Sequence, residues 1–303
     1  MRPDLTIDEL LPVAAELLQQ PLRDWHQPAA GADHLIVIAA TDSGQKVVLK
    51  AGSEANVDAD VLRRLEGTGA PVPRLLGCKQ LDSPKRGYYL AVMSFVEGAL
   101  LADVGAPHRY LAPLISAMRR VHEVTTTQAA GPVLTVAGGS TRSWTDYLLD
   151  VLTGADPEFD WSAIARSPWV DAAVLRAALD LARERVKTLP PLPRLSLLHG
   201  DLNPYNLFVH GERIAGIIDW SYARFGDPLF DFARLRMNPF VRANPEAIGL
   251  YFSLLGLGAD GLAREHNYYL FNLVEYVNWY VLDERPEGVR SLMGLLSRIL
   301  STS

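Results

Sequence analysis

Residues whose types and spacing could support chemistry gather in one stretch of the sequence, LLHGDLNPYNLFV, from Leu197 to Val209. His199, Gly200 and Asp201 come directly behind a run of leucines, and Asn206 follows five residues after Asp201, where the apolar run resumes. A carboxylate on a short loop between two buried strands is held rigidly, which suits a general base. An amide oxygen on the same loop suits a metal ligand. The stretch therefore predicts a loop that could serve a base and a metal ion together.

A second carboxylate, Asp219, ends the apolar run RIAGIID. We expect this run to be a strand that pairs with the strand after Asn206, which would bring Asp219 to the same rim as Asp201. Two carboxylates and an amide are the ligands that a hard cation such as Mg²⁺ prefers, with water and substrate phosphates completing its shell. The alternative interpretation is that these are turn and cap residues, which Asp and Asn often provide.

Composition limits the classes of protein that the chain can belong to. It has 303 residues, which exceeds what one small core usually takes, so we expect two lobes. A net charge of −6 has the wrong sign for a nucleic-acid binder and mildly favours a cationic ligand. No apolar segment is long enough for a membrane helix, and the first residues lack a signal-peptide pattern, so we expect a cytoplasmic protein. The single cysteine, Cys78, excludes an intrachain disulfide.

The first third of the sequence predicts a small antiparallel sheet with helices. The spacing of Thr6 and Glu9 predicts a helix that begins near Ile7. Two β-branched runs joined by Asp-Ser-Gly predict a hairpin, and later patterns predict a helix, an extended connector at GAPVPRLLG and another strand. These segments are His34 to Ala40 with Lys46 to Lys50, then Ala55 to Leu65, and finally Tyr88 to Val96.

Beyond Gly98 the sequence is mainly helical, because apolar residues recur at spacings of three and four in six segments. The exception lies between Leu195 and Trp220, where short apolar runs separated by HGD and HGE predict strands and tight loops. A long loop is expected between Val124 and Ser143.

Three motifs together resemble those of a known family. The segments HGDLNPYN, IIDW and GDPLFDFA are similar to the signatures of the aminoglycoside phosphotransferase and choline kinase family, small-molecule relatives of the protein kinases. The resemblance implies an α+β, two-lobed protein-kinase-like fold, with a small antiparallel-sheet N-lobe and a larger, mainly helical C-lobe. We expect residues 1–97 to form the nucleotide-binding lobe. Residues 98–303 would form the helical lobe, with the catalytic loop at 195–235 and the acceptor site.

The resemblance also implies roles for individual residues of the catalytic loop. Asp201 would be the base that orients a substrate hydroxyl and accepts its proton. Asn206 and Asp219 would hold the Mg²⁺ that bridges the phosphates of ATP or GTP. His199, Asp227 and Asp231 would support the loop, although Asp227 also fits a plain helix cap.

The N-lobe would hold the nucleotide. Lys50 closes the strand KVVLK, at the position of the lysine that contacts the α and β phosphates in this fold. Its acidic partner would be Asp58, with Glu54 as the alternative one turn away. The sequence has no G-x-G-x-x-G motif between its first strands, so a short phosphate loop at Gly31 is expected instead. The linker Ser94, Phe95 and Val96 would bond the adenine edge through backbone groups.

The acceptor is the part that the sequence specifies least. The helix REHNYYLFNLVEYVNWYVLDE is rich in aromatic residues, most of which fit a core, and it carries acids that could meet ammonium groups: Glu275, Asp283 and Glu284. Such a pocket would suit an amino sugar or a quaternary amine, and equally a glycosylated or peptidic antibiotic.

Several functions therefore stay open at this point. The leading hypothesis is an O-phosphotransferase that acts on an aminoglycoside-type antibiotic. A metabolic kinase for choline, homoserine, a thio-sugar or a similar hydroxyl compound shares the same chemistry. A pseudokinase would bind nucleotide without turnover, and a metal-dependent hydrolase using His199, Asp201 and Asp219 would act without nucleotide. The sequence leaves the ATP or GTP preference and the oligomeric state open.

Overall fold

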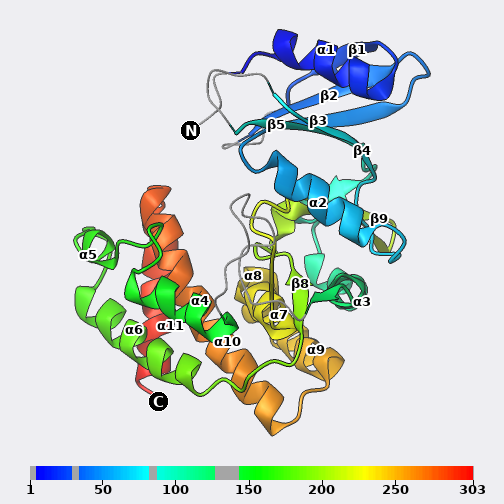
Figure 1. Cartoon of the computed structure of the whole chain (residues 1–303). Coiled ribbons are helices and arrows are strands. Elements are labelled where there is room, and N and C mark those ends of the chain that lie inside the picture. The colour runs from blue at the N-terminus through cyan, green and yellow to red at the C-terminus, as the bar shows by residue number, and fades with distance from the viewer. Residues whose placement is uncertain (1–4, 29–33, 82–86, 127–142, 303) are drawn as a thin grey trace. The chain divides into compact units, whose positions relative to one another are not determined.

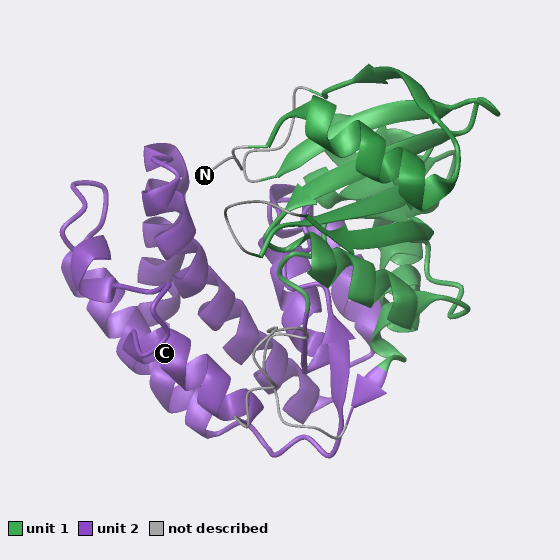
Figure 2. Cartoon of the chain, turned by 45° about the horizontal axis from the view of Figure 1, so that its top comes forward, with its two compact units in different colours: residues 1–124, 204–223 green, residues 125–203, 224–303 purple. Residues whose placement is uncertain are grey.

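The computed structural model describes residues 5–28, 34–81, 87–126 and 143–302 (Figure 1). The chain divides into two compact units, residues 1–124 with 204–223 and residues 125–203 with 224–303 (Figure 2). We call them the sheet unit and the helical unit. This division differs from the expected boundary between residues 97 and 98. Residues 99–124 belong to the sheet unit because they pair and pack with the strands at 207–217.

The sheet unit is built around a five-stranded antiparallel sheet with the strand order β1-β2-β3-β5-β4. Helix α1 covers one face of this sheet, and its Thr6 and Glu9 form the expected capping box. Helix α2 packs on β4 and β5 (Figure 1). The elements are α1 (Ile7–Leu18), β1 (Leu22–His26), β2 (Leu35–Thr41), β3 (Lys46–Gly52), α2 (Ala55–Leu65), β4 (Leu75–Gln80) and β5 (Tyr89–Ser94).

The two faces of this sheet have different neighbours, because successive side chains of a strand point to opposite sides. Val47, Leu49 and Ala51 of β3 belong to the core that includes Leu10 of α1. Lys50 lies between them in the sequence and therefore points to the opposite face, where α2 lies. The alternation of β3 thus decides that this lysine meets α2 rather than α1.

The rest of the sheet unit holds a second, three-stranded sheet with the order β10-β9-β6. Gly98 precedes β6 with φ of 143°, and a Cβ atom there would lie 2.4 Å from the carbonyl oxygen of Val209, so only glycine fits. Helix α3 packs against β10. The elements are β6 (Ala99–Leu100), the 3₁₀ turns η1 (Leu101–Asp103) and η2 (Pro107–Tyr110), α3 (Leu111–His122), η3 (Pro204–Asn206), β9 (Leu207–His210) and β10 (Arg213–Ile217).

The helical unit combines a small sheet, in the order β11-β8-β7, with eight helices among its described residues. Its central helix, α10, packs on α6, α7 and α11. The strands are β7 (Thr125–Thr126), β8 (Leu195–Leu198) and β11 (Arg224–Gly226). The helices are α4 (Trp144–Thr153), α5 (Trp161–Ile164), α6 (Ala172–Lys187), α7 (Pro228–Met237), α8 (Pro239–Arg242), α9 (Pro245–Leu255), α10 (Ala259–Leu282) and α11 (Pro286–Leu300).

The sequence analysis did not predict two strands of the larger sheet, β4 and β1. The expected extended connector ends in β4, which pairs with β5; its apolar run is short and interrupted by Gly77. Strand β1 is almost entirely exposed, so it lacks the alternating pattern that would predict a strand. Among the described residues, no helix is long and apolar enough to cross a membrane.

Candidate active site

A buried lysine forms the centre of the first group of candidate residues, in the sheet unit. The ammonium group of Lys50 donates hydrogen bonds to Asp58 Oδ2 at 2.6 Å, to Asp219 Oδ1 at 2.8 Å and to Ser221 Oγ at 3.0 Å. The lysine is 4% exposed. Burial would lower the pKa of Lys50, but the two carboxylates outweigh that effect and raise it above its usual value. The lysine is therefore held as a cation.

Asp58, rather than Glu54, is the acid that pairs with Lys50. Asp58 lies in the first turn of α2 and is 2% exposed, and its Oδ1 accepts a hydrogen bond from the backbone N–H of Trp220 at 3.0 Å. Glu54 instead lies 3.2 Å from Nε2 of His34. That hydrogen bond lowers the pKa of Glu54 to about 2, against the opposing effect of partial burial.

Asp219 is held in an unusual backbone conformation after β10. Its φ is 62°, in the left-handed region that residues other than glycine seldom adopt. Burial would raise the pKa of its carboxyl, but Lys50 and Ser221 hold it well below the usual range, so the group is ionised. Oδ1 accepts from Lys50 and Ser221. Among the described residues, Oδ2 has no hydrogen-bond partner. A strained backbone that presents an ionised carboxylate is typical of a functional site.

Asn206 belongs to the same group through the backbone. Its carbonyl oxygen accepts a hydrogen bond from the N–H of Ile218 at 3.0 Å, and Ile218 directly precedes Asp219. Asn206 ends the 3₁₀ turn η3 and is 8% exposed. The sheet unit therefore brings the backbone of Asn206 next to that of Asp219, the two residues that the resemblance assigns to a metal ion.

Asp201 is the centre of the second group, in the helical unit. Its Oδ1 accepts a hydrogen bond from the hydroxyl of Tyr276, on α10, at 2.7 Å. Its Oδ2 accepts from the amide of Asn203 at 2.8 Å. Arg234 of α7 places Nη1 3.8 Å from Oδ1 and also pairs with Glu275. The carboxylate side chain is 25% exposed, so it is fixed from behind and reachable in part.

The backbone before Asp201 is braced from α7. The carboxylate of Asp231 accepts hydrogen bonds from the N–H groups of His199 at 2.8 Å and of Gly200 at 3.0 Å. His199 is fully buried, and its Nδ1 accepts from the N–H of Asp201 at 3.2 Å. Gly200 has φ of 80°, which explains the glycine of the HGD motif.

Asp227 has a different position from Asp231. It caps α7 by accepting from the N–H of Leu229 at 3.1 Å, and it also binds Arg264 and the hydroxyl of Tyr268 on α10. Asp227 therefore fixes α7 against α10 and has no contact with the loop among those described above. The helix-cap interpretation describes it best.

The expected nucleotide linker follows β5. The N–H of Ser94 donates to the carbonyl of Arg74 at 2.9 Å, and the N–H of Phe95 lies 3.4 Å from the carbonyl of Lys46. Among the described residues the N–H of Val96 has no partner, so Val96 is the linker residue with an available donor. Gly31, the expected phosphate-loop residue, lies outside the described residues.

Comparison with known proteins is consistent with this arrangement. Residues 24–278 match the model of the phosphotransferase enzyme family. The chain belongs to that family. This membership, together with the antiparallel sheet and the helical unit, confirms the α+β, kinase-like fold that the sequence predicts.

This phosphotransferase is similar to three proteins whose names describe kinases or phosphotransferases. It is 25% identical to hygromycin-B 4-O-kinase of Escherichia coli over 242 residues, 72% of this chain and 68% of the relative. It is 28% identical to aminoglycoside 3'-phosphotransferase of Enterococcus faecalis over 243 residues, 76% of this chain and 81% of the relative. Its fold is similar, with a TM-score of 0.77 and 20% identity, to a thermostable mutant of aminoglycoside phosphotransferase APH(4)-Ia in a ternary complex with ADP and hygromycin B, over 97% and 99% of the chains.

The three acids that the sequence offers to the acceptor fall into two classes in this phosphotransferase. Glu275 is 2% exposed and paired with Arg234, so its carboxylate is buried and neutralised inside the helical unit. The helical spacing of apolar residues on α10 did not predict that Glu275 pairs with Arg234 of α7. Asp283 and Glu284 are exposed where α10 ends.

Sequence reasoning missed several residues that contact the candidate catalytic groups. Asn203 lies two residues after Asp201 within the motif, so its proximity could have been noticed. Tyr276 and Arg234 carry no such signal, because each lies far from Asp201 in the sequence and no local pattern marks a contact with the loop. Ser221 follows Asp219 by two residues and donates to its carboxylate at 2.8 Å.

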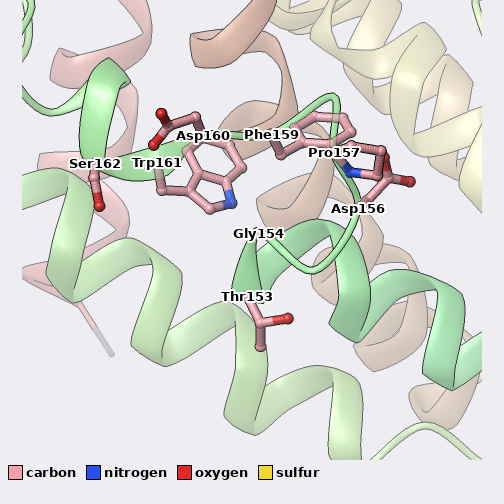
Figure 3. Close-up of a pocket in the computed structure, with 8 residues that line it drawn as sticks. All are labelled: Thr153, Gly154, Asp156, Pro157, Phe159, Asp160, Trp161 and Ser162. Atoms are coloured by element: carbon pink, nitrogen blue, oxygen red, sulfur yellow. The ribbon is translucent and has the colours of Figure 1, made fainter.

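A pocket of about 210 Å³ lies elsewhere in the helical unit, around the turn after α4 (Figure 3). Its lining includes Phe159, Trp161, Asp156 and Asp160. The two acids accept hydrogen bonds from nearby backbone N–H groups, and the indole of Trp161 donates to the carbonyl of Val151 at 2.7 Å. None of the candidate catalytic residues lines this pocket.

Proposed function

We propose that this protein transfers the γ-phosphoryl group of ATP or GTP to a hydroxyl group of a small molecule, with aminoglycoside-type antibiotics as the first class of acceptor. The observation that carries the proposal is the buried ammonium group of Lys50 between Asp58 and Asp219. A cation held in this way would meet the anionic phosphates of a nucleotide at a fixed point. The names of the similar proteins support the choice of acceptor.

The sheet unit supplies the groups for nucleotide binding. Lys50 would contact the α and β phosphates, while Asp58 keeps its ammonium group charged and in place. The available N–H of Val96, and backbone carbonyls of the linker, would bond the adenine edge. The residues proposed to contact the phosphates and those proposed to contact the adenine lie in one compact unit. Nucleotide binding should therefore depend mainly on the sheet unit.

Asp219 and Asn206 fit a magnesium ion. Mg²⁺ is usually held by one or two protein oxygens while phosphates and water complete its shell. The ionised carboxylate of Asp219 has one oxygen without a partner among the described residues, and its side chain is 45% exposed. Asn206 adds a neutral oxygen from the same unit. When bound, the ion would neutralise charge on the nucleotide phosphates.

Asp201 is the group that we propose as the base. The carboxylate would accept a hydrogen bond from the acceptor hydroxyl and take its proton as the acceptor oxygen bonds to the γ-phosphorus. The bond from that phosphorus to the β–γ bridging oxygen would break at the same time, and ADP or GDP would leave. Phosphoryl transfer passes through a loose, highly anionic transition state, so orientation and charge neutralisation supply most of the rate. The exposed acids Asp283 and Glu284 and the negative net charge would favour a cationic acceptor.

The test is nucleotide turnover with a panel of acceptors. Purified protein would be given Mg·ATP or Mg·GTP with aminoglycosides, macrolides, peptide antibiotics, choline and homoserine, and release of ADP or GDP would be followed. We expect release that depends on an aminoglycoside and a product heavier by one phosphoryl group in mass spectrometry. Release only with choline or homoserine would assign a metabolic kinase, and nucleotide binding without any release would contradict the proposal.

A further inference from the structure

The hydrogen bond between Tyr276 and Asp201 connects the central helix of the helical unit to the catalytic loop. Tyr276 lies on α10, 75 residues after Asp201, and its hydroxyl donates to Oδ1 at 2.7 Å. On the other side of the carboxylate, Asn203 donates to Oδ2. Two donors on the two oxygens fix both the direction and the plane of a carboxylate, because each bond is directional.

The surroundings of Tyr276 hold its ring in place. The guanidinium group of Arg234 lies 4.7 Å from the centre of the Tyr276 ring and 5.3 Å from that of Phe230. Its charge is balanced by Glu275, with which it pairs. The ring of Tyr280, one turn along α10, packs edge-on against Tyr276 at 5.5 Å. The phenol is therefore held between a cation and a second aromatic ring.

Arg234 does not orient Asp201 in the same direct way. The distance of 3.8 Å from Nη1 to Oδ1 is an ion pair rather than a hydrogen bond, and Nη2 is engaged by Glu275. The phenol of Tyr276, in contrast, makes a short, directional hydrogen bond to the carboxylate. Burial raises the pKa of Tyr276 above its usual value, and although Arg234 opposes this and Asp201 adds to it, the hydroxyl stays protonated and remains a donor.

We propose that Tyr276 is a positioning residue for the phosphoryl transfer: its hydroxyl fixes the carboxylate of Asp201 in the orientation that meets the acceptor hydroxyl. This inference rests on the proposed function of Asp201 as the base. A carboxylate oxygen can accept two hydrogen bonds, so a hydrogen bond from the phenol is compatible with one from an acceptor hydroxyl. The role predicts an effect on turnover and little effect on substrate binding.

The first test compares Tyr276→Phe with Tyr269→Phe. The first change removes one oxygen and keeps the ring between Arg234 and Tyr280. Tyr269, also buried on α10, has no hydrogen bond from its hydroxyl among the described residues, so it is a matched control. With the acceptor found in the panel, we expect kcat to fall at least about tenfold in Tyr276→Phe while both KM values stay within about twofold. Tyr269→Phe should match the parent.

Unchanged kcat in Tyr276→Phe, or equal losses in both variants, would overturn the proposal. A second measurement does not depend on turnover. Crystal structures of the parent and of Tyr276→Phe should show the Asp201 carboxylate rotated or in two orientations in the variant. A carboxylate in the parent position would overturn the positioning role even if no acceptor in the panel were phosphorylated. Failure of the panel alone would count against the proposed function instead.

Discussion

Lys50 and Asp58 form a buried ion pair in which the ammonium nitrogen lies 2.6 Å from Oδ2 of the carboxylate, and both side chains are at least 95% buried. The pair connects strand β3 to helix α2. The other oxygen of Asp58 accepts from the N–H of Trp220, the residue after Asp219. One carboxylate therefore sets the position of the lysine and of the backbone beside the candidate metal ligand.

Replacing Asp58 should affect stability and nucleotide use together. In Asp58→Asn the shape is kept, but Lys50 loses one of its two balancing charges. Breaking a buried pair typically costs roughly 3 kcal/mol or more of the free energy of unfolding, so we expect a loss of about that size, measured by urea denaturation. The kcat/KM for ATP should fall at least about tenfold. Glu54→Gln, which leaves Lys50 untouched, should change kcat/KM for ATP by less than about twofold. A larger loss in Glu54→Gln than in Asp58→Asn would mean that Glu54 is the functional partner of Lys50.

Substitutions of Asp201 and Asp219 should have different effects on turnover and on nucleotide binding. Asp201→Ala should leave binding of a fluorescent ADP analogue nearly intact and reduce kcat by about 10²- to 10⁴-fold, because only the base is lost. Asp219→Ala should remove the Mg²⁺-dependent part of nucleotide binding as well. Adding EDTA to the parent should reproduce the second result, and added Mg²⁺ should reverse it. Equal and mild effects from the two substitutions would contradict these roles.

Asp231 should matter for the stability of the loop. In Asp231→Ala the buried N–H groups of His199 and Gly200 lose their acceptor, and each unsatisfied buried group costs about 1–3 kcal/mol. We expect the free energy of unfolding to fall by roughly 3 kcal/mol in urea titrations. The exposed acid Asp283 offers a control, since Asp283→Asn should change stability by less than about 0.5 kcal/mol. Similar values for the two variants would show that the loop does not depend on Asp231.

Glu54 predicts a dependence of stability on acid pH. Its pKa is lowered to about 2 in the folded protein by the hydrogen bond with His34, from an ordinary value of 4.5. Between these values the unfolded chain binds more protons than the folded one, so stability falls as the pH falls. The contribution of Glu54 is complete above pH 4.5 and is lost as the pH approaches 2. Thermal unfolding should be measured from pH 6 to pH 2.5 for the parent and for Glu54→Gln. The difference between their unfolding temperatures should shrink as the pH falls. A difference that stays constant would contradict the lowered pKa of Glu54.

The sequence by itself determined the parts that depend on local patterns. Alternating apolar residues predicted the β2–β3 hairpin, capping residues predicted the start of α1, and turn chemistry with short apolar runs predicted the loop from His199 to Asn206. The spacing of three motifs indicated the family, and the expected candidate residues for the base, the metal ion and the lysine came from it. These features are encoded within a few residues, because strand and helix periods and turn geometry are local.

Only the tertiary structure decided which distant side chains meet. Lys50 and Asp219 are 169 residues apart, and Tyr276 and Asp201 are 75 apart, so no local pattern marks either pair. The sequence analysis offered Glu275 to the ammonium groups of an acceptor, but packing of α10 on α7 places Arg234 against it and buries both. Such contacts depend on how whole helices and strands pack. The pattern of one sequence indicates which positions are buried, but it does not indicate which distant residues contact each other there.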